Sequence, residues 1–234
     1  MEIKGIDVSK WQGRIDWKAV AGSGVKFAMI RAAYGSTSGR ITIDPYFAEN
    51  VRGAVAAGIR VGVYLYSYAR TVYAARLEAQ NLVAALATSK EQITYPVAYD
   101  LEDASQQSLG RVRNGEMVRA FCDVVRVAGY QPILYANKSW IDNHIDVPDD
   151  VPVWLARWGV SDPGMPCQMW QYSDSGSVAG IKGSVDLNIS YVDFSAPDYR
   201  HQVKARFGFE DKTLDYLAAY KYGADLLRKL ATAP

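Results

Sequence analysis

A chain of 234 residues can bury one full-sized core, and α/β barrels commonly have about 200 to 250 residues in one domain. Hydrophobic residues make up 49% and charged residues 22%, a globular mixture that excludes extended disorder. The net charge of +1, without a run of Lys or Arg, argues against nucleic acid as a partner.

Short apolar runs alternate with longer amphipathic stretches through roughly the first 130 residues, which is typical of repeated β-α units around a parallel sheet. Strands are expected over Lys4–Val8, Lys26–Ala32, Arg60–Tyr68, Tyr95–Leu101 and Gln131–Tyr135. Helices are expected between them, over Trp17–Ala21, Pro45–Ala57, Val72–Ala87 and Val112–Ala128. Two glycines, Gly58 and Gly129, stand where a helix C-cap glycine is expected.

The pattern changes after Tyr135, where strand-like runs follow one another without full helices between them. These runs are Val153–Ala156, Gln168–Tyr172 and Asp186–Tyr191. The chain therefore has eight expected strands, the number that closes a small, mostly parallel barrel with a filled interior. We assign residues 1–198 to this barrel.

The composition changes again from Phe207 onward. Apolar residues recur at helical spacing, and Asp211 precedes them as a plausible N-cap. One amphipathic helix is therefore predicted over 207–234, either packed on the barrel or serving as an appendage. The residues that set this spacing are Leu214, Leu217, Ala224 and Leu227.

Apart from acidic residues, the chain has few side chains that could carry out catalysis. The chain has only two histidines, His144 and His201, too few for a His-rich metal site or a Ser-His-Asp relay. Cys122 and Cys167 lie far apart without metal-ligand spacing, and we interpret both as buried thiols. Acidic residues must therefore carry the chemistry.

Acidic residues occur at several expected strand ends. Asp100 and Glu102 follow an apolar run, and residues two apart in a strand project from the same face, with Cα atoms roughly 6 to 7 Å apart. Repulsion between two such carboxylates raises the pKa of one and makes it a proton donor. Asp7 and Asp186 add two more acids at the rim of the barrel. Glycosidic bond cleavage uses this combination, and the 16 Tyr and 6 Trp suit a sugar-binding surface.

From Gly5 to about Asp193 the chain resembles the family-25 glycoside hydrolases, the muramidase type of lysozyme. The motifs are Gly5-Ile6-Asp7-Val8-Ser9-Lys10-Trp11-Gln12-Gly13, Phe27-Ala28-Met29-Ile30-Arg31-Ala32 with Tyr34-Gly35, Gly62-Val63-Tyr64-Leu65-Tyr66, Asp100-Leu101-Glu102, Leu134-Tyr135, Trp154-Leu155-Ala156, Trp170-Gln171-Tyr172 and Val185-Asp186-Leu187-Asn188. One departure is Tyr66-Ser67-Tyr68, which stands where many relatives have an aromatic-His pair.

The resemblance implies a TIM-like barrel of five β/α units completed by three strands, and hydrolysis of the β-1,4 bond between N-acetylmuramic acid and N-acetylglucosamine. It implies Glu102 as the general acid, Asp100 as its neighbouring carboxylate, and Asp7 and Asp186 as two further acids that raise the pKa of Glu102. It implies no metal and no cofactor. The residues that it places along the sugar are Tyr64, Tyr66, Asn137, Trp154 and Gln171.

Asp100 is expected to orient the reacting sugar, through an N-acetyl group that attacks the anomeric carbon, although direct attack by Asp100 or by water with inversion stays open. The partner implied is peptidoglycan, with no membrane insertion; the C-terminal helix is a candidate for self-association or wall attachment. No signal-peptide pattern is visible, so we expect a phage or prophage endolysin released by lysis or a holin-type route, or a secreted enzyme whose leader was removed.

Three rival interpretations remain at this stage. A chitinase-like hydrolase also carries acids spaced by one residue on its fourth strand, but with a longer acidic series than this chain has. A non-catalytic wall-binding protein would keep the sugar-binding residues without the chemistry. An interaction protein built around the terminal helix would not depend on the barrel for its activity.

Overall fold

The structure is a computed structural model that describes residues 2–195 and 199–233. It forms two compact units with the boundary between Phe194 and Ser195. The helix that begins at Tyr199 therefore belongs to the second unit, ahead of the expected start of the helical segment at Phe207.

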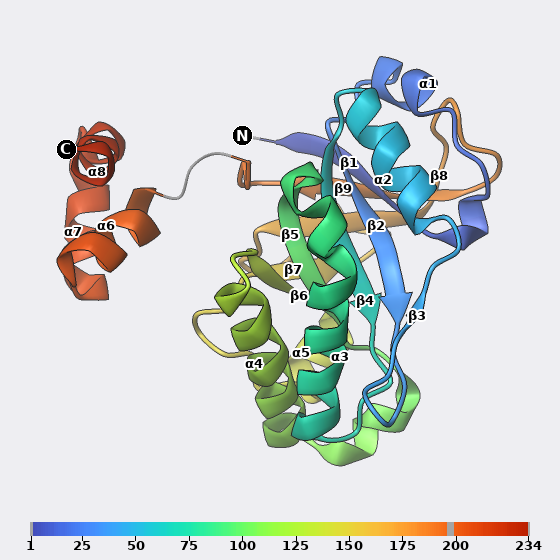
Figure 1. Cartoon of the computed structure of the whole chain (residues 1–234), viewed down its shortest axis with the longest axis horizontal. Coiled ribbons are helices and arrows are strands. Elements are labelled where there is room, and N and C mark those ends of the chain that lie inside the picture. Colours follow the sequence, from blue (N-terminus) through green and yellow to red (C-terminus); the bar gives the residue numbers. More distant parts are fainter. Residues whose placement is uncertain (1, 196–198, 234) are drawn as a thin grey trace. The chain divides into compact units, whose positions relative to one another are not determined.

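The first unit is a closed barrel (Figure 1). Its strands follow the order β1-β9-β8-β7-β6-β5-β4-β2, and β2 pairs with β1 to close the ring. All neighbours are parallel except β9, which runs antiparallel to both β8 and β1. The eight strands are β1 (Ile3–Val8), β2 (Phe27–Tyr34), β4 (Arg60–Tyr66), β5 (Ile93–Asp100), β6 (Pro132–Asn137), β7 (Val153–Ala156), β8 (Met169–Gly176) and β9 (Val185–Ser190).

A helix follows each of the first five barrel strands, whereas β7, β8 and β9 follow without helices, so the expected five β/α units completed by three strands are confirmed. These helices are α1 (Trp17–Gly22), α2 (Phe47–Ala56), α3 (Val72–Leu86), α4 (Arg111–Val127) and α5 (Lys138–Asn143). The short elements are η1 (Lys10–Gln12), β3 (Thr42–Ile43), which pairs with β2, η2 (Ala87–Gln92) and η3 (Ala104–Leu109).

Local sequence signals account for several helix ends. The side chains of Asp16 and Thr71 accept backbone N–H bonds at the starts of α1 and α3. Gly58 and Gly129 follow α2 and α4 with φ of 76° and 84°, a left-handed conformation that glycine adopts without steric cost. Both C-cap glycines predicted from the sequence are confirmed.

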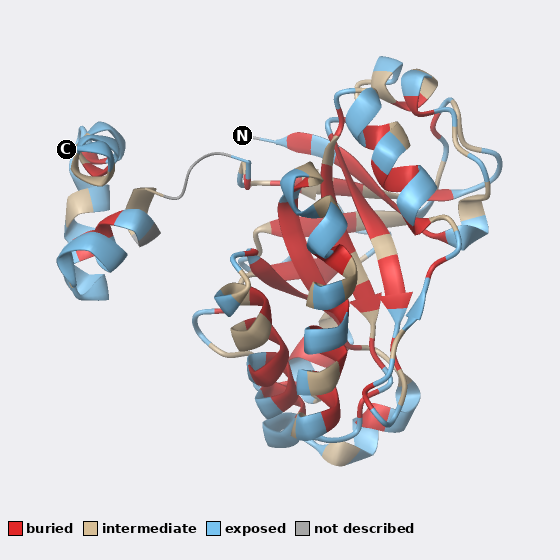
Figure 2. Ribbon diagram, in the orientation of Figure 1, coloured by how far each residue is buried: buried red, intermediate tan, exposed pale blue. Residues whose placement is uncertain are grey.

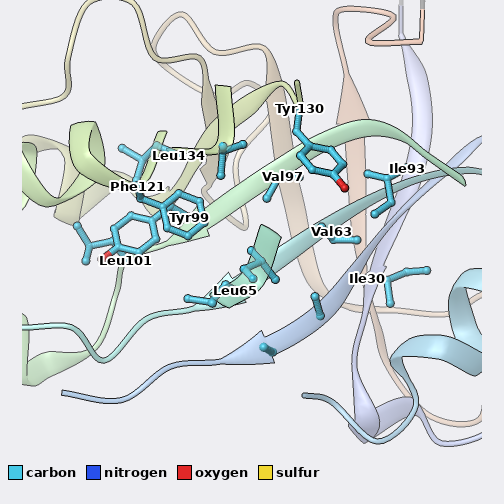
Figure 3. Close-up of a cluster of buried hydrophobic side chains, with 14 of the residues drawn as sticks. Ile30, Val63, Leu65, Ile93, Val97, Tyr99, Leu101, Phe121, Tyr130 and Leu134 are labelled. Carbon is cyan, nitrogen blue, oxygen red and sulfur yellow. The ribbon is translucent and has the colours of Figure 1, made fainter. Parts of the chain in front are cut away.

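Alternation along the strands creates two apolar layers. Outward-facing residues pack under the helices, whose inner faces are buried (Figure 2), and Figure 3 shows part of this layer around Val63, Leu65 and Val97. Inward-facing residues fill the barrel itself, where the rings of Phe27 and Tyr95 stack at 4.9 Å. The apolar filling leaves polar side chains at the carboxyl ends of the strands.

The second unit contains three helices, α6 (Tyr199–Phe207), α7 (Asp211–Ala219) and α8 (Gly223–Thr232). The segment is helical as expected, but it is not the single helix that the leucine spacing predicted. Gly208 follows α6 with φ of 67°, so the chain turns there and a new helix begins with Glu210, not Asp211, as its N-cap. Val203, Leu214 and Leu227 form the small core of this unit.

Both cysteines are free thiols. Cys122 is buried in α4, but Cys167 is only partly buried, so the expectation of two buried thiols is correct for Cys122 alone. Within the described ranges, no helix has the length and apolar character needed to cross a membrane.

Candidate active site

The four acids singled out in the sequence gather at one end of the barrel. Asp100 is the last residue of β5, and Glu102 lies two residues beyond it. Asp7 pairs in register with Asp186, because β9 runs antiparallel to β1 and its first residues reach the same end as the carboxyl ends of the parallel strands. This is the end where α/β barrels carry their catalytic groups.

Asp7 is buried, and protein donors satisfy its carboxylate. Its Oδ2 accepts hydrogen bonds from Gln171 Nε2 at 2.8 Å and from Asn188 Nδ2 at 2.7 Å. A further hydrogen bond joins Asp7 to Asp186. Donors from β8 and β9 thus converge on one carboxylate of β1, which offsets the cost of removing its charge from water.

Aromatic side chains fix the direction of both amide groups. Asn188 Oδ1 accepts from Trp154 Nε1 at 2.8 Å. Gln171 Oε1 accepts from Tyr135 Oη at 3.0 Å and from Trp158 Nε1 at 3.1 Å. Because an indole N–H can only donate, each amide must present its oxygen to the tryptophan and its NH2 group to Asp7.

Sequence reasoning identified only part of this amide-aromatic frame. It proposed Trp154 and Gln171 as sugar ligands, and the structure shows that both also orient Asp7. It gave no site role to Asn188, Tyr135 or Trp158. Alternation along β6 and β9 could have indicated Tyr135 and Asn188, whereas Trp158 lies in a loop beyond β7 and gives no such signal.

The remaining proposed sugar ligands lie at neighbouring strand ends. The ring of Tyr64 meets Trp154 edge-on at 6.1 Å, and the ring of Tyr66 contacts Tyr68 at 5.1 Å. Burial and then the nearby carboxylates raise the pKa of Tyr64, first through Asp7. Asn137 is partly committed elsewhere, since its Oδ1 accepts the N–H of Trp140 at 3.0 Å as the N-cap of α5.

Burial makes these acids hold protons more strongly than usual. Removal from water raises the pKa of Asp100 well above its ordinary range, and the charge of Glu102 adds to this effect. The pKa of Glu102 is raised by burial and next by Asp7. Burial and Asp7 raise the pKa of Asp186 to about 8. At this value Asp186 holds a proton near neutral pH, which it can share with Asp7 through their hydrogen bond.

A cation also lies close to the acids. The Arg31 guanidinium lowers the pKa of Asp100 and of Tyr64, opposing the effect of burial. Asp44 holds Arg31 in place through contacts of 2.9 Å to Nε and 2.7 Å to Nη2. The backbone N–H of Lys10 also bonds Asp44, so the loop after β1 is tied to the same ion pair. Sequence reasoning gave Arg31 no role.

The arrangement combines protonated and ionised carboxyl groups in a largely dry environment, which suits acid-assisted cleavage of an acetal bond such as a glycosidic linkage. Among the residues that the structure describes, no group of three or more His, Cys, Asp or Glu side chains is arranged to hold a metal ion.

Comparisons with known proteins agree with this chemistry. The sequence profile of Glycosyl hydrolases family 25 matches residues 6–181. The autolytic lysozyme of Clostridium acetobutylicum is 33% identical over 80% of this chain and 55% of its own. The N,O-diacetylmuramidase of Chalaropsis sp. is 30% identical over 79% of this chain and 96% of its own.

A solved structure gives the same result for the fold. The modular autolysin LytC from Streptococcus pneumoniae, in complex with a synthetic peptidoglycan ligand, superimposes with a TM-score of 0.70 at 27% identity. The match covers 81% of this chain and 47% of LytC. This chain therefore spans about half of that autolysin and of the clostridial lysozyme.

The protonated Asp186 predicts a pH-dependent stability. Its pKa of about 8 lies above the ordinary 3.8, so its contribution to folding is complete at low pH and is lost as pH rises through about 8. Asp186→Asn cannot ionise but can still donate to Asp7. The free energy of unfolding of this variant, measured in denaturant, should therefore rise relative to the wild type between about pH 4 and pH 9.

The matched control is Asp149→Asn, at an exposed position in the loop before β7, which should follow the wild type at every pH. Equal pH dependence in the wild type and Asp186→Asn would show that Asp186 does not hold the proton.

Proposed function

Because the chain belongs to family 25 of the glycosyl hydrolases and is a glycoside hydrolase, we propose that it cleaves the β-1,4 bond between N-acetylmuramic acid and N-acetylglucosamine in bacterial peptidoglycan. The observation that carries this proposal is the cluster of four desolvated carboxyl groups at one barrel end, with raised pKa values. The names of the relatives support peptidoglycan as the substrate. An enzyme that cleaves the cell wall is consistent with the predicted phage or prophage origin.

In the proposed reaction, Glu102 protonates the leaving glycosidic oxygen. Its carboxyl group is only partly buried, so it can reach a bound sugar, whereas Asp100 is 3% exposed and lies deeper. Burial, and next the charge of Asp7, raise the pKa of Glu102, which favours its role as a proton donor. We assign to Asp100 the orientation of the N-acetyl group, because its carboxyl group is buried at the end of β5, two residues before Glu102.

The amide-aromatic frame supplies the electrostatic part of this mechanism. Asp7 holds a negative charge that three donors fix in place, from Gln171, Asn188 and Asp186. A fixed anion at the barrel end stabilises the positive charge that develops at the anomeric carbon. Since the donors are already oriented before substrate arrives, little reorganisation is needed in the transition state.

Replacing the proposed acid tests the chemistry directly. Glu102→Gln removes the transferable proton at nearly constant shape, so release of reducing ends from purified peptidoglycan should fall by about 10²- to 10⁴-fold. Circular dichroism and thermal unfolding should show an intact fold. Glu116→Gln, at an exposed position of α4, is the control and should retain full activity. Substantial activity in Glu102→Gln would refute the assignment.

We also propose that the second unit attaches the enzyme to the wall. Tyr216 is 80% exposed, and the rings of Tyr220 and Tyr222, both exposed, meet at 5.9 Å. Exposed aromatic rings stack well on sugars. Residues 199–233 contain seven Lys and Arg against four Asp and Glu, which favours contact with an anionic polymer. The alternative is self-association of the chain.

Truncation separates these roles. A chain lacking residues 195–234 should hydrolyse soluble glycan fragments at the wild-type rate, because the acids and their partners all lie in the first unit. When both chains carry Glu102→Gln, so that neither digests the walls, the truncated chain should sediment with insoluble walls less than the full chain. Equal sedimentation of the two would refute wall attachment, and a concentration-dependent mass for the full chain alone would favour self-association.

A further inference from the structure

Glu78 is a buried acid outside the barrel that the proposed mechanism does not use. It lies in the middle of α3 and is 0% exposed. Its Oε2 accepts the hydroxyl proton of Ser67 at 2.7 Å, and its Oε1 accepts the N–H of Tyr68 at 3.4 Å. The backbone N–H groups of Ser36 and Ala69 also bond this carboxyl group. These donors come from the loops after β2 and β4.

Ser67 connects Glu78 to two further elements. Since Ser67 gives its one proton to Glu78, its oxygen accepts from the groups around it. These are Tyr99 Oη at 2.9 Å, the Ala69 N–H at 3.1 Å and Gln106 Nε2 at 3.4 Å. Tyr99 lies on the outer face of β5 beside Phe121, as Figure 3 shows, and Gln106 lies in η3.

The same segment is bonded directly to the catalytic strand ends. The N–H of Ser67 donates to the carbonyl oxygen of Asp100 at 2.9 Å, and the N–H of Gly35 donates to the carbonyl oxygen of Tyr66 at 2.8 Å. Glu78 packs against Gly35 so closely that a Cβ at this position would collide with Oε1. One side chain of α3 therefore contacts, directly or through Ser67, the ends of β2, β4 and β5.

We propose that Glu78 is a positioning residue that fixes the backbone at Ser67 and thereby holds Asp100 and Tyr66 in their catalytic geometry. The inference rests on the proposed function, because it concerns the turnover of that site. Small displacements at a reacting centre are costly, so the loss of this anchor should lower kcat even though Glu78 is separated from the substrate by the barrel wall.

Conservative replacement is expected to preserve the anchor. Burial raises the pKa of Glu78 to about 7, so the neutral carboxyl group is already populated near neutral pH. A glutamine matches that neutral form, because its oxygen can accept the backbone N–H groups while its NH2 faces Ser67, whose proton then turns toward Tyr99. An alanine offers neither partner.

The test uses the full chain and measures kcat and KM separately on peptidoglycan fragments. Glu78→Ala should lower kcat by about 10- to 100-fold with KM within about twofold, and Glu78→Gln should restore most of the loss. The matched control is Leu82→Ala, one turn along α3, which opens a cavity in the apolar layer and removes no side-chain hydrogen bond. It should lower the melting temperature and leave kcat unchanged.

Each other outcome has a defined meaning. If Glu78→Ala lowers only stability, as Leu82→Ala does, or if glutamine gives no recovery, the positioning role is refuted. If Glu78→Ala does not fold, Ser67→Ala is the deciding variant. It removes the hydroxyl group that bonds Glu78 Oε2, and it should also lower kcat. A wild-type chain without activity on these fragments would overturn the proposed function, and this inference with it.

Discussion

The burial of the Asp7 carboxylate is the constraint on which the active end of the barrel depends. A carboxylate removed from water costs several kcal/mol unless donors replace its hydration. Those donors come from β8 and β9, and they reach Asp7 because β9 runs antiparallel between β8 and β1. The reversed last strand is therefore a requirement of the site as well as a means of closing the barrel.

The pKa values of the other acids in the site depend on how deeply each is buried and on the charges beside it. Burial and the neighbouring Asp7 raise the pKa of Asp186, and burial and the neighbouring Glu102 raise the pKa of Asp100. Arg31, anchored by Asp44, limits the effect on Asp100. Outside the barrel, a second polar cluster around Glu78 ties the strand ends together. The site is thus supported from inside by amides and indoles and from outside by a buried acid.

The sequence was sufficient for much of this architecture because its signals are local. The apolar run Val153–Ala156 predicted the exact bounds of β7, and the position of Asp7 after an apolar run predicted the end of the barrel at which it lies. The site role of Asn188 was missed because it depends on a long-range contact. Its side chain bonds Asp7, which lies 181 positions away in the sequence. The single helix predicted over 207–234 was wrong because the apolar spacing from Leu214 to Leu227 continues across the break between α7 and α8, where Tyr220 is extended.

The most direct test of the proposed activity is the chemical identity of the new chain ends. Purified peptidoglycan would be digested, its fragments reduced with borohydride, and the products identified by mass spectrometry. Reduced muramic acid is expected at the new reducing ends, because the leaving oxygen protonated by Glu102 would belong to N-acetylglucosamine. Reduced glucosamine ends, or cleavage in the peptides, would contradict it.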